Sequence, residues 1–128
     1  MEIVKTKPPI YDKAHEQFGV EWDDGVIFTY GDKIHCKYDL SPQKVVHESI
    51  HVQQQGQNPE AWWKKYFEDK EFRLNQEMEA YAAEFLFLKD KIKDRNELTR
   101  AKWSIAQDLA SPMYGSLIGF WEVMKVLK

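Results

Sequence analysis

The sequence predicts a helix-dominated α+β fold, in which a small antiparallel β-hairpin is followed by about four or five helices. Two helix starts are marked by a capping residue and a proline, at Ser41–Pro42 and Asn58–Pro59. A β-rich segment interrupted by Gly31–Asp32 precedes them. Because 128 residues with 43% hydrophobic content supply one modest core, we expect a single domain over residues 1–128.

The first forty residues are expected to contain the sheet. Residues 1–20 include two prolines and predict an irregular lead-in or a short helix near Asp12–Gln17. The hairpin strands are expected at Val26–Tyr30 and Lys33–Tyr38, which are rich in β-branched and aromatic residues. Gly31–Asp32 between them is the expected turn.

Five helices are expected after the hairpin. The first begins with Ser41 as the capping hydroxyl and Pro42 in the first turn, and it ends at Gly56. The other four are predicted at about Pro59–Glu68, Glu71–Lys93, Glu97–Ala110 and Ser116–Leu127.

The composition argues against several functional classes. The net charge is -3, from 18 basic and 21 acidic residues, so no basic field is present to bind nucleic acid. No apolar run resembles a signal peptide or is long enough to span a bilayer, which predicts a soluble chain with no membrane partner. The single cysteine, Cys36, allows no internal disulfide and fits a reducing, cytoplasmic setting.

The segment 45–55, VVHESIHVQQQ, contains the residues of a metal site. His47 and His51 are four residues apart, so on a helix they project side by side, where one Zn²⁺ can accept both nitrogens at about 2.0–2.1 Å. Glu48 lies beside them and can take a proton from a metal-bound water and return it to a leaving amine. The alternative is an ordinary amphipathic helix with two histidines. Buried histidines need partners, and the apolar neighbours that predict burial are Val45, Val46, Ile50 and Val52.

A catalytic zinc site needs a third protein ligand and an open position. No histidine follows the motif, and His35 in the hairpin is expected to be a strand residue with a satisfied ring. The candidates are therefore glutamates of the long helix. With about 100° per residue, Glu77 borders the apolar stripe and Glu84 shares its direction two turns later, whereas Glu79 falls on the solvated face. We favour Glu77 and keep Glu84 in reserve. The stripe comprises Leu74, Met78, Tyr81, Phe85, Leu88 and Ile92.

An HExxH motif on one helix and a glutamate on a later helix resemble the gluzincin group of zinc metallopeptidases. More closely, the chain is similar to small metallopeptidases of phages and bacteria over most of residues 25–116. The matching segments are Tyr30–Gly31, Pro59–Trp63, Phe72–Arg73, Glu77, Ala80–Tyr81 and Tyr114–Gly115. In gluzincins the residue four positions after the ligand glutamate often supports a ligand histidine. Here that residue is Tyr81, where Asp or Asn is more usual, and its hydroxyl can supply such a bond.

The resemblance implies a minimal zincin-like catalytic domain that holds Zn²⁺ on the histidine pair and a glutamate. It also implies that a strand on the rim of the cleft pairs with an extended peptide, for which Lys33–Tyr38 is the candidate. Tyr114, in the break SPMYGS between two helices, is the candidate donor to the oxyanion.

Two further groups are interpreted as structural. The aromatic residues of the second helix are expected in the core, with at most one ring at the cleft, and they are Trp62, Trp63, Tyr66 and Phe67. Gln53, Gln54 and Gln55 are expected to form the exposed end of the motif helix.

The sequence therefore predicts a zinc-dependent metallopeptidase-like hydrolase, in which water attacks a peptide or amide carbonyl of a peptide or protein substrate. Glu48 is the expected general base and Tyr114 a second catalytic residue. The expected metal ligands are His47, His51 and Glu77. Two alternatives stay open: a non-catalytic, metal-stabilised module that binds a peptide or protein, with a fourth ligand such as Glu84, and an amidase of cell-wall peptides. The substrate and the oligomeric state also stay open.

Overall fold

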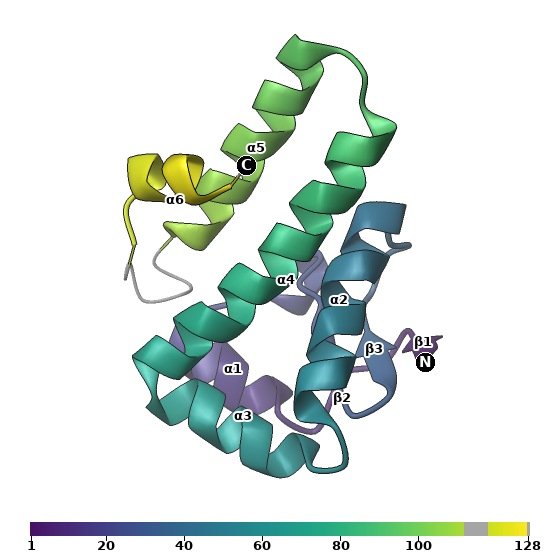
Figure 1. The fold of residues 1–128 in the computed structure, drawn as a ribbon. Coiled ribbons are helices and arrows are strands. Elements are labelled where there is room, and N and C mark those ends of the chain that lie inside the picture. The colour runs from purple at the N-terminus through teal and green to yellow at the C-terminus, as the bar shows by residue number, and fades with distance from the viewer. Residues whose placement is uncertain (112–117, 128) are drawn as a thin grey trace.

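The computed structural model describes residues 1–111 and 118–127 and has a helix-dominated α+β fold (Figure 1). Its strands are β1 (Glu2–Val4), β2 (Phe28–Tyr30) and β3 (Lys33–His35), and a short 3-10 helix, η1, covers Trp22–Asp24. The α-helices are α1 (Tyr11–Phe18), α2 (Pro42–Gln55), α3 (Pro59–Glu68), α4 (Lys70–Lys91), α5 (Arg95–Leu109) and α6 (Phe120–Val126). In the part of the chain that is described, the predicted hairpin is thus followed by five helices, and α1 confirms the short helix expected near its position.

The sheet has three strands in the order β1-β3-β2. β2 and β3 form the predicted antiparallel hairpin, with Thr29 opposite Ile34. Gly31 in the turn has a φ of 66°, the left-handed conformation that a tight hairpin turn favours and that glycine adopts without strain. β1 pairs in parallel with the other edge of β3 and was not expected, because a three-residue strand with a distant partner leaves no local sequence pattern.

The expectation that Lys33–Tyr38 forms the rim strand of the cleft is wrong. β3 ends at His35 and lies between β1 and β2, so both of its edges are paired. The outer edge on the side of the motif helix belongs to β2. There the carbonyl oxygen of Thr29 accepts hydrogen bonds from Gln55 Nε2 at 2.6 Å and from Trp63 Nε1 at 2.9 Å, which tie β2 to α2 and α3.

Two apolar clusters lie on either side of the region where α2 meets α4. One joins α4, α5 and α6 around Tyr81, Phe85 and Leu109. The other joins α1, β2 and α3 around Tyr11 and Phe28. It includes the four aromatic residues of α3, each 6% exposed, which confirms that they belong to the core: Trp62, Trp63, Tyr66 and Phe67.

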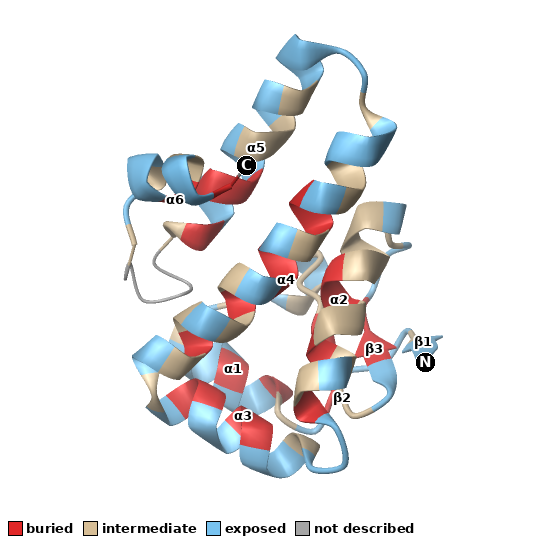
Figure 2. Ribbon diagram, in the orientation of Figure 1, coloured by how far each residue is buried: buried red, intermediate tan, exposed pale blue. Residues whose placement is uncertain are grey.

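Helices α2 and α4 lie side by side and run antiparallel, since Lys44 near the start of α2 contacts Glu84 and Gln54 near its end contacts Gln76 (Figure 1). Besides the predicted apolar stripe, α4 has a second buried face on the side of α2 and α3 (Figure 2). Its residues, spaced by four, three and four positions, are Arg73, Glu77, Ala80 and Glu84. A polar interface is therefore buried between the two apolar clusters.

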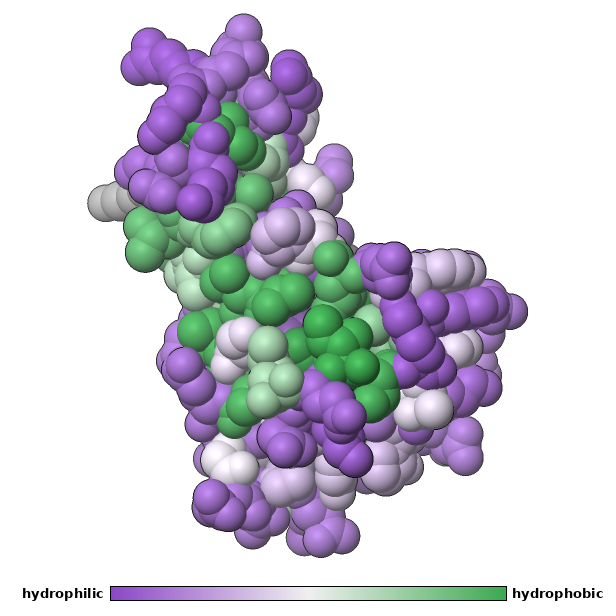
Figure 3. All heavy atoms as spheres, turned by 90° about the vertical axis from the view of Figure 1, so that its right-hand side faces the viewer, coloured by the Kyte–Doolittle hydropathy of each residue, from purple (hydrophilic) through white to green (hydrophobic). Residues whose placement is uncertain are grey.

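Burial on α2 differs from the expectation. The apolar residues beside the motif are only half-buried: Val45, Val46, Ile50 and Val52. The buried residues of α2 are instead polar: His47, Glu48, His51 and Gln55. On the α2 and sheet side of the molecule, apolar side chains gather in the middle of the surface with hydrophilic ones around them (Figure 3). On the buried face of α2, α4 covers His47 and His51, and β2 covers Glu48 and Gln55.

The helix boundaries agree closely with the prediction. α2 starts at Pro42 as expected, but the Ser41 hydroxyl makes no capping hydrogen bond, whereas the Asn58 side chain caps α3 by accepting from the Ala61 amide at 3.0 Å. Of the last helix, predicted over residues 116–127, residues 116 and 117 lie outside the described part, and α6 begins at Phe120. Among the described helices none combines the length and the apolar character needed to cross a membrane.

Candidate metal centre

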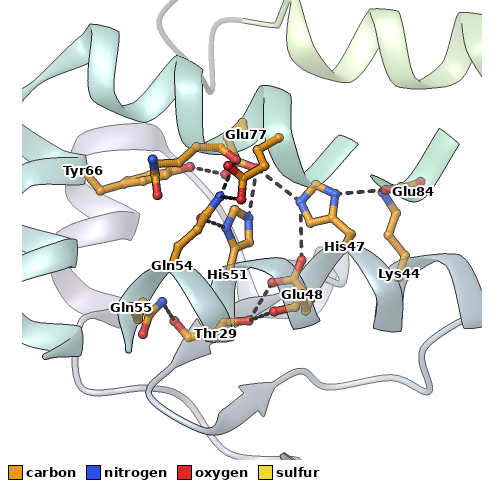
Figure 4. A network of polar contacts seen from close by, with 12 residues as sticks. Thr29, Lys44, His47, Glu48, His51, Gln54, Gln55, Tyr66, Glu77 and Glu84 are labelled. Carbon is orange, nitrogen blue, oxygen red and sulfur yellow. Dashed lines mark hydrogen bonds and ion pairs between the residues drawn. The ribbon is translucent and has the colours of Figure 1, made fainter. Parts of the chain in front are cut away.

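His47 and His51 on α2 and Glu77 on α4 converge on one point, here called the centre (Figure 4). Glu77 Oε1 lies 3.1 Å from His47 Nε2 and 3.1 Å from His51 Nε2. The three potential ligand atoms all lie within 4.8 Å of one another, and the side chains are buried. Because ligand atoms on a tetrahedral zinc at 2.0–2.1 Å are about 3.3 Å apart, these contacts are close to those of a three-ligand site.

The outer nitrogen of each imidazole faces an acceptor. His47 Nδ1 lies 3.0 Å from Glu84 Oε1, and His51 Nδ1 lies 2.8 Å from Gln54 Oε1. A proton on each Nδ1 satisfies these acceptors and leaves the Nε2 lone pair directed at the centre. A metal-ligating histidine needs this tautomer, and a carboxylate or carbonyl partner commonly holds it in place.

Glu84 lies behind His47 and not in the centre. Its Oε1 also accepts a hydrogen bond from Lys44 Nζ at 3.2 Å, and it does not belong to the group of converging ligand atoms. The geometry therefore favours Glu77 over Glu84 as the third ligand. Glu84 is the hydrogen-bond partner of His47 Nδ1. The Tyr81 ring packs edge-on against the His47 ring, with centroids 4.3 Å apart.

The buried Glu77 carboxylate needs a positive charge beside it, either on the imidazoles or between them. Burial lowers the pKa of His47, but its hydrogen bonds to Glu77 and Glu84 outweigh burial and raise that pKa to about 10. The pKa of His51 is also raised, because the negative charge of Glu77 outweighs the effect of burial. Burial raises the pKa of Glu77, but the two histidines outweigh it and hold that pKa well below its ordinary range. At neutral pH the metal-free centre thus keeps a proton on His47, and a metal cation bound there would take the place of that positive charge.

We expect the stability of the metal-free chain and its zinc affinity to change in opposite directions with pH. Because its folded pKa is raised, the His47 imidazolium stabilises the fold fully below pH 6.5, and this contribution is lost as the pH rises through about 10. Ionised Glu77 stabilises the fold above pH 4.5, so both contributions are complete between pH 4.5 and 6.5. Zinc needs unprotonated nitrogens, so its affinity should rise with pH above that window.

Calorimetric titration of zinc at pH 7, in buffers of different ionisation enthalpy, measures the protons that zinc displaces. We expect zinc to displace at least the proton that the raised pKa keeps on His47 at this pH. Thermal unfolding of the metal-free chain between pH 6 and pH 10 gives the matching stability curve, which should fall. Zinc binding without proton release would contradict the assignment of His47 and His51 as ligands.

Glu48 lies beside the centre without joining it. Its Oε2 is 3.6 Å from His47 Nε2, and its Oε1 accepts a hydrogen bond from Thr29 Oγ1 at 3.0 Å. The Thr29 hydroxyl therefore holds one carboxylate oxygen and leaves the other near the histidine nitrogens (Figure 4). From this position a carboxylate can take a proton from a water held at the centre.

Tyr66 contacts the centre and was missed in the sequence as a site residue. Its hydroxyl donates to Glu77 Oε2 at 2.6 Å, which leaves Oε1 of the same carboxylate for the two histidines. Arg73 donates from Nη1 to the Tyr66 carbonyl at 2.8 Å. Burial and the Glu77 charge raise the pKa of Tyr66 well above its ordinary value, so the hydroxyl keeps its proton. The ring is a core residue as predicted, and nothing local in the sequence shows which core tyrosine points its hydroxyl at a ligand.

The expectation that the glutamines end α2 as an exposed tail is wrong for two of the three. Gln55 is 4% exposed, donates to the Thr29 carbonyl and accepts from the Gly31 amide at 2.7 Å. The side-chain oxygen of Gln54 faces His51 Nδ1 as its acceptor, and the Gln54 side-chain nitrogen donates to the Gln76 carbonyl at 3.0 Å. Gln53 is exposed as expected. The buried Gln55 amide thus connects α2 to the hairpin, and the half-buried Gln54 amide connects it to α4.

The centre opens into a cleft with an inner and an outer part. The inner part is a small cavity of about 60 Å³ that is partly open to solvent, and its lining is mostly apolar and aromatic. The outer part continues past His47 and Glu48 to the end of α5, where Lys44, Tyr81 and Asp108 line it. A ligand that enters along the outer part therefore meets the histidine nitrogens and the Glu48 carboxylate.

Two expectations concern residues outside the centre. Tyr114 lies outside the described residues, so its role as an oxyanion donor stays a prediction. His35 is a buried strand residue, with Nδ1 2.8 Å from the Thr6 carbonyl oxygen, as expected.

No protein-family model, no curated protein and no solved structure matches the chain. What supports a function is therefore the geometry of the centre and the cleft around it.

Proposed function

We propose that the chain is a zinc-dependent metallopeptidase-like hydrolase of the gluzincin type. The observation that supports this is the convergence of His47 Nε2, His51 Nε2 and Glu77 Oε1 at 3.1 Å contacts, with both Nδ1 atoms turned to acceptors. Two imidazole nitrogens and one carboxylate, with a fourth position left open, are a recurrent ligand set of catalytic zinc sites.

Each residue of the centre has a distinct task in this proposal. Zinc, when bound by the three ligands, supplies a Lewis acid that polarises a carbonyl and lowers the pKa of a bound water. Glu48 takes the proton of the attacking water and returns it to the leaving amine, while Thr29 keeps its carboxylate in position. Tyr66 holds Oε2 of Glu77 and so keeps Oε1 directed at the centre.

Two other functions share this centre. A non-catalytic, metal-stabilised binding module needs a fourth protein ligand, for which Glu84 was the candidate. Glu84 is hydrogen-bonded to His47 Nδ1 and to Lys44 instead. This supports the catalytic arrangement, in which the fourth ligand position is open. An amidase of cell-wall peptides would differ only in its substrate. We also propose a cytoplasmic setting, which is supported by the buried, free thiol of Cys36.

The test is the zinc content of the chain, purified without chelators or a metal-affinity tag, followed by incubation with a complex peptide mixture read by mass spectrometry. We expect about one zinc per chain, cleavage of internal peptide bonds, loss of both after treatment with a chelator, and return of both with added zinc. A chain without stoichiometric metal would refute the proposal. Bound zinc without cleavage would favour the binding module.

A further inference from the structure

β1 forms one edge of the sheet, and its outer side has no strand partner in the part of the chain that is described. The Glu2 amide donates to the Asp32 carbonyl at 2.9 Å. The Val4 carbonyl accepts from the Cys36 amide at 3.1 Å. Because the backbone groups of successive strand residues point to opposite sides, the N–H and C=O of Ile3 face away from β3. There they can pair with a strand of another chain.

The side chain of Ile3 lies on the face of the sheet that α2 covers. Ile3, Ile34 and Thr29 are aligned across the three strands, so their side chains project to the same face. The Thr29 hydroxyl contacts Glu48 of α2, which identifies this face. Ile3 is 44% exposed, so its apolar surface is open at the edge beside α2.

The side of α2 that lies next to β1 carries no charge. Met1 identifies this side, since its sulfur lies 3.4 Å from Ser49 Oγ. The titratable side chains of α2 contact α4 or β2 instead: Lys44, His47, Glu48 and His51. The remaining surface, here called the outer face of α2, is half-buried and uncharged and consists of Val45, Val46, Ser49 and Ile50. In a chain with 30% charged residues, an uncharged and largely apolar helix face is typical of the core of a protein interface (Figure 3).

Two copies of the chain are complementary at this surface. When β1 pairs antiparallel with β1 of a second copy about a two-fold axis at Ile3, the two Ile3 residues exchange both of their backbone hydrogen bonds. The two sheets become continuous, both α2 helices lie on the same face, and their outer faces turn toward each other. Because the outer face is uncharged, it meets its own copy without repulsion between like charges. The charged neighbours of Ile3 are already paired within one copy, Glu2 with Lys33 and Lys5 with Asp39.

The area that a stable dimer needs indicates that α2 takes part in the contact. Such an interface buries about 800 Å² per copy, which is close to a tenth of the 7623 Å² accessible surface of the chain. The edge of a three-residue strand is too short to supply this area, so the outer face of α2 must supply the rest. Of the described residues that line the cleft, none belongs to β1 or to the outer face, so pairing leaves the metal centre accessible.

We infer that the chain forms a two-fold symmetric dimer in solution, through antiparallel pairing of β1 at Ile3 and contact between the outer faces of α2. The inference does not depend on the proposed function, because it uses none of the residues of the centre.

The test is the molar mass of the untagged chain in solution, measured by light scattering after size-exclusion chromatography at increasing protein concentration. We expect about 30 kDa, twice the 15.2 kDa of one chain. Ile3→Lys places two like charges opposite each other at the axis, so it should weaken the dimer on the order of 100-fold or more and shift the mass to that of one chain. Leu86→Lys, at a 70% exposed residue of α4, is the matched control and should stay dimeric.

A mixture of two variants tests the position of the axis. Ile3→Glu alone should also have the mass of one chain, but its equimolar mixture with Ile3→Lys should recover the mass of a dimer, because opposite charges then meet at the axis. A wild-type chain that keeps the mass of one chain at every concentration overturns the inference, whether or not the variants fold. A dimer that survives Ile3→Lys, or a mixture that does not recover the dimer, overturns the pairing at Ile3.

Discussion

Replacing Glu77 with glutamine is expected to lower the zinc affinity of the chain by more than 100-fold. The amide is close to the carboxylate in shape, so the hydrogen bond from Tyr66 can persist, but the negative charge that faces both Nε2 atoms is lost. The loss should exceed the 10- to 100-fold effect typical of a group that only supports a ligand.

Two other glutamates of α4 provide graded controls for this substitution. Glu84→Gln weakens the partner of His47 Nδ1 and of Lys44 Nζ but removes no converging ligand atom, so it should lower zinc affinity by about 10- to 100-fold. Glu79 is exposed, and its contact with Gln54 is 3.4 Å long, so Glu79→Gln should leave zinc affinity nearly unchanged. Competition titration with a zinc chelator of known affinity gives the three values. A larger loss at Glu84 than at Glu77 would reverse the ligand assignment.

Replacing Glu48 with glutamine is expected to abolish hydrolysis while zinc stays bound. The amide oxygen can still accept from the Thr29 hydroxyl, so the side chain should keep its place, but an amide cannot take a proton from water. General acid–base catalysis contributes about 10²- to 10⁴-fold to rate, and a loss of that size in kcat is expected.

The measurement combines zinc content with the rate of peptide cleavage for the wild type and Glu48→Gln. Glu60→Gln, the same change at an exposed position of α3, is the matched control and should retain both properties. Unchanged cleavage in the Glu48 variant would remove this residue from the proposed mechanism. Joint loss of zinc and cleavage would show that Glu48 supports the metal and not the proton transfer.

Local patterns in the sequence predicted most of the helices, because their signals lie within a few residues. The prolines after Ser41 and Asn58 mark the first turns of α2 and α3, and the bounds of α3 match the prediction. The signal for the hairpin turn at Gly31 also lies within a few residues. β1 had no such signal, since its pairing with β3 depends on a distant segment. The wrong choice of Lys33–Tyr38 as the rim strand follows from that omission.

Part of the candidate site was also predictable. The spacing of His47 and His51 requires only one helix, and the phase of α4 ranks Glu77 above Glu79. The same phase places Glu84 in nearly the same direction as Glu77, so helix geometry alone could not choose between them. The antiparallel contact of α2 with α4 makes the choice, because it sets Glu77 at both Nε2 atoms and Glu84 at the Nδ1 of His47.

By itself, the sequence determined the helix-dominated α+β class, the motif helix and the residue types of the centre, all of which depend on short-range periodicity and composition. Only the tertiary structure decided that the polar face of α2 is buried, and that Gln54, Thr29 and Tyr66 position the centre. These roles arise where a buried polar atom must find a partner on another element. That pairing depends on how the elements pack, which no short stretch of sequence specifies.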